Sequence, residues 1–289
     1  MTKYQNDTNI ANYHSSHHEK IAMNSKVALV TGASSGIGLV TAQALVDAGY
    51  RVFGTSRKPV ADSLGITMLI CDVTDENSVQ KLINEIMQQV GRIDLVVNNA
   101  GIGLIGAAEE SSILQAQRVF DVNVFGVARV VNAVLPIMRN QKSGRIINMS
   151  SLLGLIPSPF NAFYASTKHA IEGYTESLDH EIRKFGIRAL LVQPGVTKTS
   201  FEDNLTRVDN PLSIYENQRE RSEKLMRKWV EEGDAPIVVA EMVVKAATAT
   251  HPKLRYTAGK QSTQVSLLRR FMPEKFVDNT LRKFNGFTD

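Results

Sequence analysis

The segment KVALVTGASSGIG, residues 26–38, constrains the fold most strongly. An apolar run is followed by a glycine-rich turn, and a helical pattern then continues to Gly49. In parallel α/β proteins this order holds the pyrophosphate of a dinucleotide, because glycines let the backbone approach it and the helix N-terminus supplies N–H donors. A plain glycine-rich turn is the alternative, since the spacing G-x-x-x-G-x-G differs from the common G-x-G-x-x-G fingerprint.

Further apolar runs alternate with helical patterns along the rest of the chain. The runs are RVFGTS, MLICDV, IDLVVNNAG, RIINMSS, RALLVQPG and LRYTAG, and the helical patterns cover about 75–90, 115–138 and 163–185. Strands that are apolar throughout and alternate with helices are typical of a buried parallel sheet. We therefore predict an α/β fold: a single Rossmann-type doubly wound parallel sheet of about seven strands, with helices on both faces.

The same pattern suggests how the chain is divided. Residues 1–24 are polar and predict a disordered or loosely attached tail, and residues 25–260 form one catalytic domain. Within it, about 199–233 is polar and irregular and is a candidate substrate lid. Residues 261–289 form a helical extension that Pro273 breaks into two pieces. This extension packs on the domain or on a partner subunit, with contact to a membrane surface as the alternative.

Composition excludes several classes of function. The chain has 289 residues and a net charge of +4 with no basic runs, so we expect no nucleic-acid partner. It has no apolar run of about 18 residues that would span a bilayer. The single Cys71 allows no internal disulfide and fits a reducing, cytoplasmic location. His14, His17 and His18 lack nearby carboxylates or thiols, so we expect no metal site.

The end of the second predicted strand bears on the choice of dinucleotide. NAD-binding units place Asp or Glu there to bind the ribose 2′-OH, whereas this chain has Ser56 and Arg57. A carboxylate would repel a 2′-phosphate, and an arginine can pair with it. We therefore expect NADP(H), with NAD(H) as the less favoured alternative.

Taken together and in order, the motifs resemble those of the short-chain dehydrogenase/reductase family over about residues 26–260. They are TGASSGIG, Asp72 in CDV, NNAG at 98–101, Asn123 in DVNVFG, Ser151 in NMSS, YASTK at 164–168, and PG at 194–195 followed by Thr199. Each is weak alone, but their order is highly specific. The stretch GLIPSPFNAFYASTKHAIEG is similar to the hydroxysteroid and retinol dehydrogenase-like branch.

The resemblance implies cofactor contacts at the matching positions, with Asn98 supporting the central strands. These positions are Gly32, Ser34, Ser35, Gly36, Ile37, Gly38, Ser56, Arg57, Asp72, Val73, Asn98, Ala100, Gly101, Tyr164, Lys168, Pro194, Gly195, Thr197 and Thr199.

It also implies a catalytic tetrad of Asn123, Ser151, Tyr164 and Lys168. Residues four apart share one helix face, so Lys168 can place a cation beside Tyr164 and lower its pKa toward the range needed for proton transfer. Ser151 can donate a hydrogen bond to the substrate oxygen, and it stands thirteen residues before the tyrosine, where the family has its serine; Ser150 competes for the role. Asn123 would support a proton-relay water.

The residues after Ser151 are apolar and predict a hydrophobic carbonyl or alcohol substrate, such as a steroid, retinoid or long-chain compound. Leu152, Leu155, Ile156, Phe160 and Phe201 are the candidate wall. Simple packing of the domain is the alternative for these side chains. By resemblance, the helices at 115–138 and 163–185 form the interface of a homo-oligomer, a dimer or tetramer. The rival functions are an NAD-dependent alcohol dehydrogenase and a non-catalytic NADP-sensing or scaffold protein.

Overall fold

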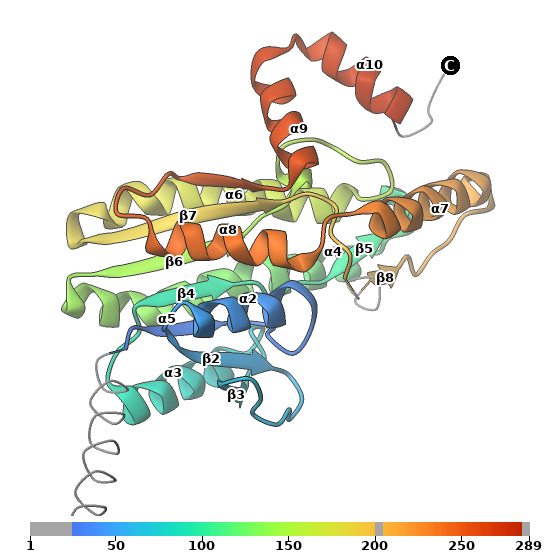
Figure 1. Cartoon of the computed structure of the whole chain (residues 1–289). Helices are drawn as coiled ribbons and strands as arrows, with labels where there is room; N and C mark the ends of the chain where they lie inside the picture. The colour runs from blue at the N-terminus through green and yellow to red at the C-terminus, as the bar shows by residue number, and fades with distance from the viewer. Residues whose placement is uncertain (1–24, 200–204, 285–289) are drawn as a thin grey trace, which may run out of the picture.

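A computed structural model describes residues 25–199 and 205–284. Its centre is a seven-stranded sheet in the order β3-β2-β1-β4-β6-β7-β9, and every neighbouring pair is parallel (Figure 1). This confirms the predicted fold class. The strands are β1 (Val27–Val30), β2 (Arg51–Ser56), β3 (Ile66–Ile70), β4 (Leu95–Asn98), β6 (Gly144–Met149), β7 (Ile187–Pro194) and β9 (Arg255–Ala258).

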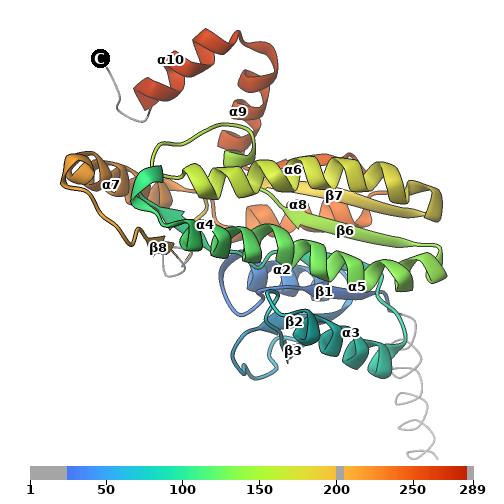
Figure 2. The ribbon, with the colours of Figure 1, turned by 180° about the vertical axis from the view of Figure 1, so that it is seen from behind.

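Helices cover both faces of the sheet, as Figure 2 shows from behind. Strand residues alternate between two hydrophobic cores, because successive side chains of a strand point to opposite faces. In β1, Val27 and Leu29 belong to one core, and Ala28 and Val30 to the other. The first core includes α3 (Glu76–Val90), α5 (Gly126–Gln141) and α6 (Ala162–Ile182); the second includes α2 (Gly36–Asp47) and α8 (Pro236–Thr248).

The strand order reverses between β1 and β4. From β1 the chain runs outward through β2 and β3 on one side. It then returns to β4, on the other side of β1, and runs outward through β6, β7 and β9. Loops leaving the carboxyl ends of β1 and β4 therefore turn in opposite directions and leave a crevice, which is where open α/β sheets bind ligands.

One continuous helical stretch, Ile113–Gln141, is long and apolar enough to cross a membrane by length and composition. It consists of α4 (Ile113–Phe120), a π-helical turn (Asp121–Phe125) and α5. Val130, Val134 and Met138 are fully buried in the core against the sheet. We therefore read the stretch as a core helix of the domain.

The segment after β7 is more regular than predicted. Within 205–232 it contains β8 (Leu205–Arg207), a 3-10 turn (Ser213–Tyr215) and α7 (Glu216–Glu232), and β8 pairs in parallel with β5 (Gly103–Ile105). The prediction of an irregular segment was therefore wrong. Helix α7 is mostly charged and has no fully buried residue, so its composition looked like that of an irregular loop. We call residues 205–232 the lid segment.

The C-terminal extension forms two helices, α9 (Lys260–Phe271) and α10 (Glu274–Phe284), interrupted at Pro273 as predicted. Both figures show α9 leaving the body of the domain and α10 lying furthest from the sheet. In α10 the side chain of Val277 is buried, whereas most of its neighbours are exposed.

Candidate active site

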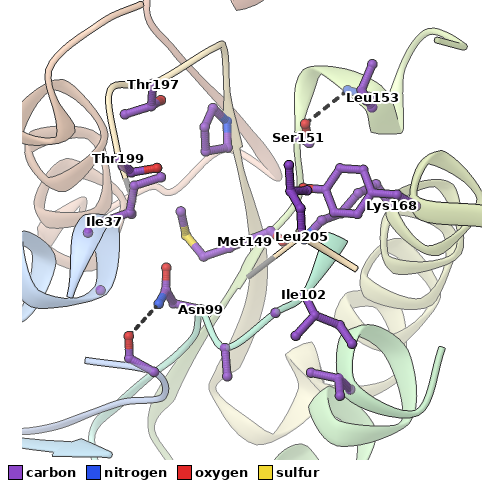
Figure 3. A pocket seen from close by; sticks show the side chains of 18 of the residues that line it. Ile37, Asn99, Ile102, Met149, Ser151, Leu153, Lys168, Thr197, Thr199 and Leu205 are labelled. Atoms are coloured by element: carbon purple, nitrogen blue, oxygen red, sulfur yellow. Dashed lines mark hydrogen bonds between the residues drawn. The ribbon is translucent and has the colours of Figure 1, made fainter. Parts of the chain in front are cut away.

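A cavity of about 970 Å³ opens at the carboxyl ends of the strands. It extends from the glycine-rich turn after β1 to the start of α6 and to the lid segment. Figure 3 shows Ile37, Thr197 and Thr199 on one side of it, with Ser151 and Lys168 on the other. One cavity thus contains both the predicted dinucleotide cradle and the predicted catalytic residues.

The cradle is fixed by hydrogen bonds between the ends of β1 and β4. The Thr31 hydroxyl accepts from the backbone N–H groups of Asn99 and Ala100, both at 3.0 Å. The Asn99 amide donates to the carbonyls of Thr31 and Gly32 at 3.0 and 3.1 Å. Asn99 is a positioning residue that sequence reasoning missed, although it lies inside the NNAG motif.

The glycines leave room that other residues would fill. Gly32 and Gly36 have φ of +66° and +55°, which favours glycine. A Cβ on Gly38 would collide with the Gly32 carbonyl and the Asn99 amide. Ser35 precedes α2 without capping it through its side chain, so the first N–H groups of α2 keep donor capacity toward the cavity. A phosphate group fits this cradle. The structure places all six predicted cradle residues at the cavity surface: Gly32, Ser34, Ser35, Gly36, Ile37 and Gly38.

Ser56, Arg57, Asp72 and Val73 line the opposite end of the cradle. Arg57 is exposed beside the cavity. Burial alone would raise the pKa of Asp72, but hydrogen bonds from Thr74 and the charges of Arg57 and Arg129 outweigh it and lower that pKa. Asp72 accepts from the Thr74 N–H at 2.9 Å and from its hydroxyl at 2.8 Å, so it also shapes the loop.

The loop after β7 and the NNAG turn complete the cradle. Ala100, Gly101, Pro194, Gly195, Thr197 and Thr199 line the cavity. Asn98 does not. Its side chain is buried and donates to Asn148 at 2.8 Å, and Asn148 in turn donates to Thr175 at 2.9 Å. Asn98 therefore ties β4 to β6 and, through Asn148, to α6, which agrees with the supporting role but not with direct contact to a cofactor.

Ser151, Tyr164 and Lys168 face one another in the cavity. The hydroxyl of Ser151 accepts from the Leu153 N–H at 3.1 Å and is hydrogen-bonded to Tyr164. The Lys168 ammonium lies 5.6 Å from the centre of the Tyr164 ring and donates to the Met149 carbonyl at 2.9 Å. Ser150, the competing serine, has a buried hydroxyl, and a Cβ on Gly154 would touch it.

The pKa of Tyr164 differs from the expected direction. Burial raises it to about 12, and the hydrogen bond with Ser151 only partly offsets this effect. Burial lowers the pKa of Lys168 to about 8, with Glu172 acting in the opposite direction. In the cavity as it stands, desolvation thus outweighs the predicted influence of Lys168, and Tyr164 holds its proton at neutral pH.

Asn123 lies behind the cavity wall in the π-helical turn. Its side chain accepts from the Ile102 N–H and donates to the Ile102 carbonyl, both at 2.9 Å, and it donates to the Thr167 hydroxyl at 3.2 Å. Thr167 precedes Lys168 on α6, so Asn123 connects the NNAG loop with the helix that carries Tyr164 and Lys168.

The structure brings only part of the predicted substrate wall to the cavity. Leu152 and Ile156 line the cavity, whereas Leu155 and Phe160 do not. The Phe160 ring instead packs edge-on against the Tyr215 ring, with the ring centres 6.3 Å apart, and the Phe160 backbone has a positive φ. Phe201 lies outside the described residues. The wall also includes Met226, Trp229 and Val230 of α7 and Leu281 of α10. The i, i+3, i+4 spacing of Met226, Trp229 and Val230 in KLMRKWV, residues 224–230, was a signal for the three α7 residues.

The described residues offer no set of metal ligands. Within residues 25–199 and 205–284, no group of three or more His, Cys, Asp or Glu side chains could hold an ion. Cys71 is buried, and its surroundings raise its pKa to about 11, mainly by desolvation.

Known sequences place this site in context. The sequence model described as short chain dehydrogenase matches residues 26–210. A 3-ketodihydrosphingosine reductase of Bacteroides thetaiotaomicron is 36% identical over 265 residues, covering 91% of this chain and 98% of that protein. Retinol dehydrogenase 8 of Bos taurus is 34% identical over 272 residues, covering 86% of each.

Solved structures share the fold. A short-chain dehydrogenase of Streptomyces avermitilis has a TM-score of 0.78 and 29% identity, covering 91% of this chain and 97% of that one. ElxO, solved with NADP bound, has a TM-score of 0.69 and 26% identity, covering 83% of this chain and 99% of that one.

Proposed function

The chain is a member of the short-chain dehydrogenase/reductase family, and from this premise we propose that it interconverts a carbonyl and a secondary alcohol with NADP(H). The observation that carries the proposal is the meeting of Ser151, Tyr164 and Lys168 in the cavity that also contains the glycine cradle. The bound nicotinamide would supply or accept the hydride. The roles below belong to the chain's own residues.

Tyr164 is the proton donor to the substrate oxygen in the reductive direction. Its raised pKa keeps it protonated at neutral pH, as a general acid requires. Ser151 is hydrogen-bonded to Tyr164 and can donate to the same substrate oxygen as negative charge develops there. The Lys168 ammonium uses one N–H group for the Met149 carbonyl and can donate another to a ribose hydroxyl of the cofactor. Asn123 fixes the position of α6 relative to the NNAG loop.

Arg57 supports the choice of NADP(H). It is exposed beside the cavity, one residue beyond β2, where a 2′-phosphate would lie in a dinucleotide-binding unit. No acidic side chain follows β2 before Asp62, so the feature that selects NAD is missing from this turn. ElxO was solved with NADP, which agrees with this proposal.

The substrate proposal is a hydrophobic carbonyl or alcohol with a long chain or fused rings. Its support is the apolar wall made by Leu152, Ile156, Met226, Trp229 and Leu281. The relatives named for 3-ketodihydrosphingosine and for retinol suggest the same class.

Exposed apolar residues on α4 and the following turn support a homo-oligomer. Ile113, Leu114 and Phe125 are all more than half exposed. We propose that this surface packs on a second copy, in a cytoplasmic dimer or tetramer.

The variant Tyr164→Phe tests the proposal. We expect turnover of a long-chain ketone with NADPH to fall by about three orders of magnitude, because the proton donor is lost while the cradle is untouched. NADPH binding, followed by fluorescence, should stay within a few-fold of the parent. Tyr174→Phe on the same helix is the matched control and should keep full activity. Turnover of Tyr164→Phe as high as that of Tyr174→Phe would refute the catalytic role of Tyr164. NADPH binding by the parent without turnover of any ketone would instead favour a non-catalytic NADP-binding protein.

A further inference from the structure

The turn between α9 and α10 leaves large apolar side chains in solvent. Leu267 and Phe271 lie one turn apart on α9, Met272 follows, and Phe276 lies in the first turn of α10, with exposures of 54%, 67%, 45% and 51%. We call these four residues the elbow patch. Single exposed apolar residues are ordinary, but four within ten residues on a projecting turn indicate a binding surface. Figures 1 and 2 show α9 and α10 projecting from the domain.

The elbow patch is surrounded by positive charge. The two helices carry six basic and two acidic residues, a net +4 that equals the net charge of the whole chain, so the remainder is balanced. Among the described residues, Arg269, Arg270 and Lys275 have no carboxylate within ion-pair distance. The Arg270 guanidinium lies 5.5 Å from the centre of the Phe271 ring. The charged residues are Lys260, Arg269, Arg270, Lys275, Arg282, Lys283, Glu274 and Asp278.

We propose that the elbow patch docks the protein on the surface of an anionic lipid bilayer. Aromatic and aliphatic side chains at the tip of an amphipathic, basic element would insert among the headgroups, while the arginines and lysine pair with lipid phosphates and carboxylates. A second copy of the same surface is a poorer occupant, because a symmetric contact would place net positive charge against itself.

The other side of α10 connects this surface with the cavity. Val277 is 1% exposed, and Leu281, one turn later, lines the cavity. A single helix therefore presents Phe276 outward and Leu281 inward. Docking through the elbow would bring the cavity close to the bilayer, where a water-insoluble substrate resides. Vesicle binding itself does not depend on the proposed reaction, so the two ideas can fail separately.

Vesicle flotation of the full-length protein tests the proposal. The probes are phosphatidylcholine vesicles with and without about 30% phosphatidylserine. We expect binding only to the anionic vesicles, and its loss near 0.5 M NaCl, roughly the regime of strong screening. The variant F271S/F276S should lower the bound fraction about ten-fold, and R269Q/R270Q/K275Q should do the same.

Matched variants separate this surface from general stickiness. Leu64→Ser removes an equally exposed apolar residue elsewhere, and K81Q/K142Q/K245Q removes the same charge from other faces. Both should bind vesicles like the parent. Equal loss in the controls, or no vesicle binding by the parent, would overturn the proposal. A third outcome would also overturn it: F271S/F276S binds vesicles like the parent but sediments as a monomer where the parent is an oligomer. That result would assign the elbow patch to contact with a second copy.

Discussion

Glu110, which has no solvent-exposed surface, forms an ion pair with Arg219 of α7, so a buried carboxylate fastens the lid segment to the domain. Glu110 also accepts from the backbone N–H groups of Ala107 at 2.9 Å and Leu212 at 2.8 Å. Burial alone would raise its pKa, but these bonds and Arg219 outweigh it and lower that pKa. The carboxylate thus links the turn at 108–110 both to Leu212 and to α7, whose Met226, Trp229 and Val230 line the cavity.

Glu110→Gln should loosen the lid segment without disturbing the cradle. A neutral amide cannot satisfy two N–H groups and an arginine equally well, and weakening a buried charged network costs about 2 kcal/mol. We expect KM for a long-chain ketone to rise about ten-fold, while the Kd for NADPH stays the same. Steady-state kinetics and cofactor titration measure the two quantities.

Glu109→Gln is the control for this experiment. Glu109 accepts from the Tyr215 hydroxyl at 2.5 Å, but the contact is exposed to solvent, so its loss should change KM little. If Glu110→Gln weakened NADPH binding as much as ketone binding, the carboxylate would be stabilising the whole site and not the lid segment.

Reduction should weaken above about pH 8. Because burial lowers the pKa of Lys168 to about 8, its positive charge is lost within the usual assay range, whereas Tyr164, with a pKa of about 12, stays protonated. The kcat/KM for NADPH in ketone reduction should therefore be level below pH 7 and fall above pH 8. In Lys168→Arg, which stays charged, this fall should disappear even if overall activity is lower. A profile of the parent that stays level to pH 10 would contradict the assignment.

Arg57→Ala should affect the two cofactors differently. Removing the guanidinium takes away its pairing with a 2′-phosphate, which NADH lacks. We expect KM for NADPH to rise at least ten-fold, which corresponds to about 1.4 kcal/mol, with KM for NADH unchanged. Lys81→Ala, which removes an exposed cation of α3 that does not line the cavity, controls for general loss of charge. Equal losses for both cofactors would mean that Arg57 acts on a group they share.

The fold could be predicted because apolar runs alternate with helical patterns along most of the chain, so many positions indicate the same architecture. Most strands of the seven-stranded sheet are apolar runs. The turn after β1 needs its glycines because a side chain would collide there, as a Cβ on Gly38 would with the Gly32 carbonyl. The positions of Ser151, Tyr164 and Lys168 followed from an ordered set of motifs. These features depend on short stretches of chain.

The features that the sequence did not predict depend on contacts between residues far apart in the chain. Glu110 and Arg219 are 109 residues apart, and Asn98 and Asn148 are 50 apart, so neither pair has a local signature. Helix α7 is largely charged, which hid the three apolar residues that face the cavity. The pKa of Tyr164 was expected to fall because of one neighbour, but the surrounding burial, which no spacing reveals, raises it.

Asp179 provides a last prediction, on stability in acid. It is fully buried, accepts from Arg188 and Arg183 at 2.8 Å each, and accepts from the Ala189 N–H at 3.0 Å. Burial would raise the pKa of Asp179, but these partners outweigh it and lower that pKa. The carboxylate therefore stabilises the fold above the ordinary aspartate pKa of about 4, and this stabilisation is lost as pH falls through the lower folded-state value.

Asp179→Asn should lower the free energy of unfolding by about 3 kcal/mol at pH 7, because two arginines lose their charged partner. The difference from the parent should stay constant down to about pH 4 and shrink below it, since the parent then loses the same charge by protonation. Urea unfolding at several pH values measures this, with the exposed Asp278→Asn as control. A difference that persists unchanged at the lowest pH at which the parent still folds would mean that shape, and not charge, makes Asp179 stabilising.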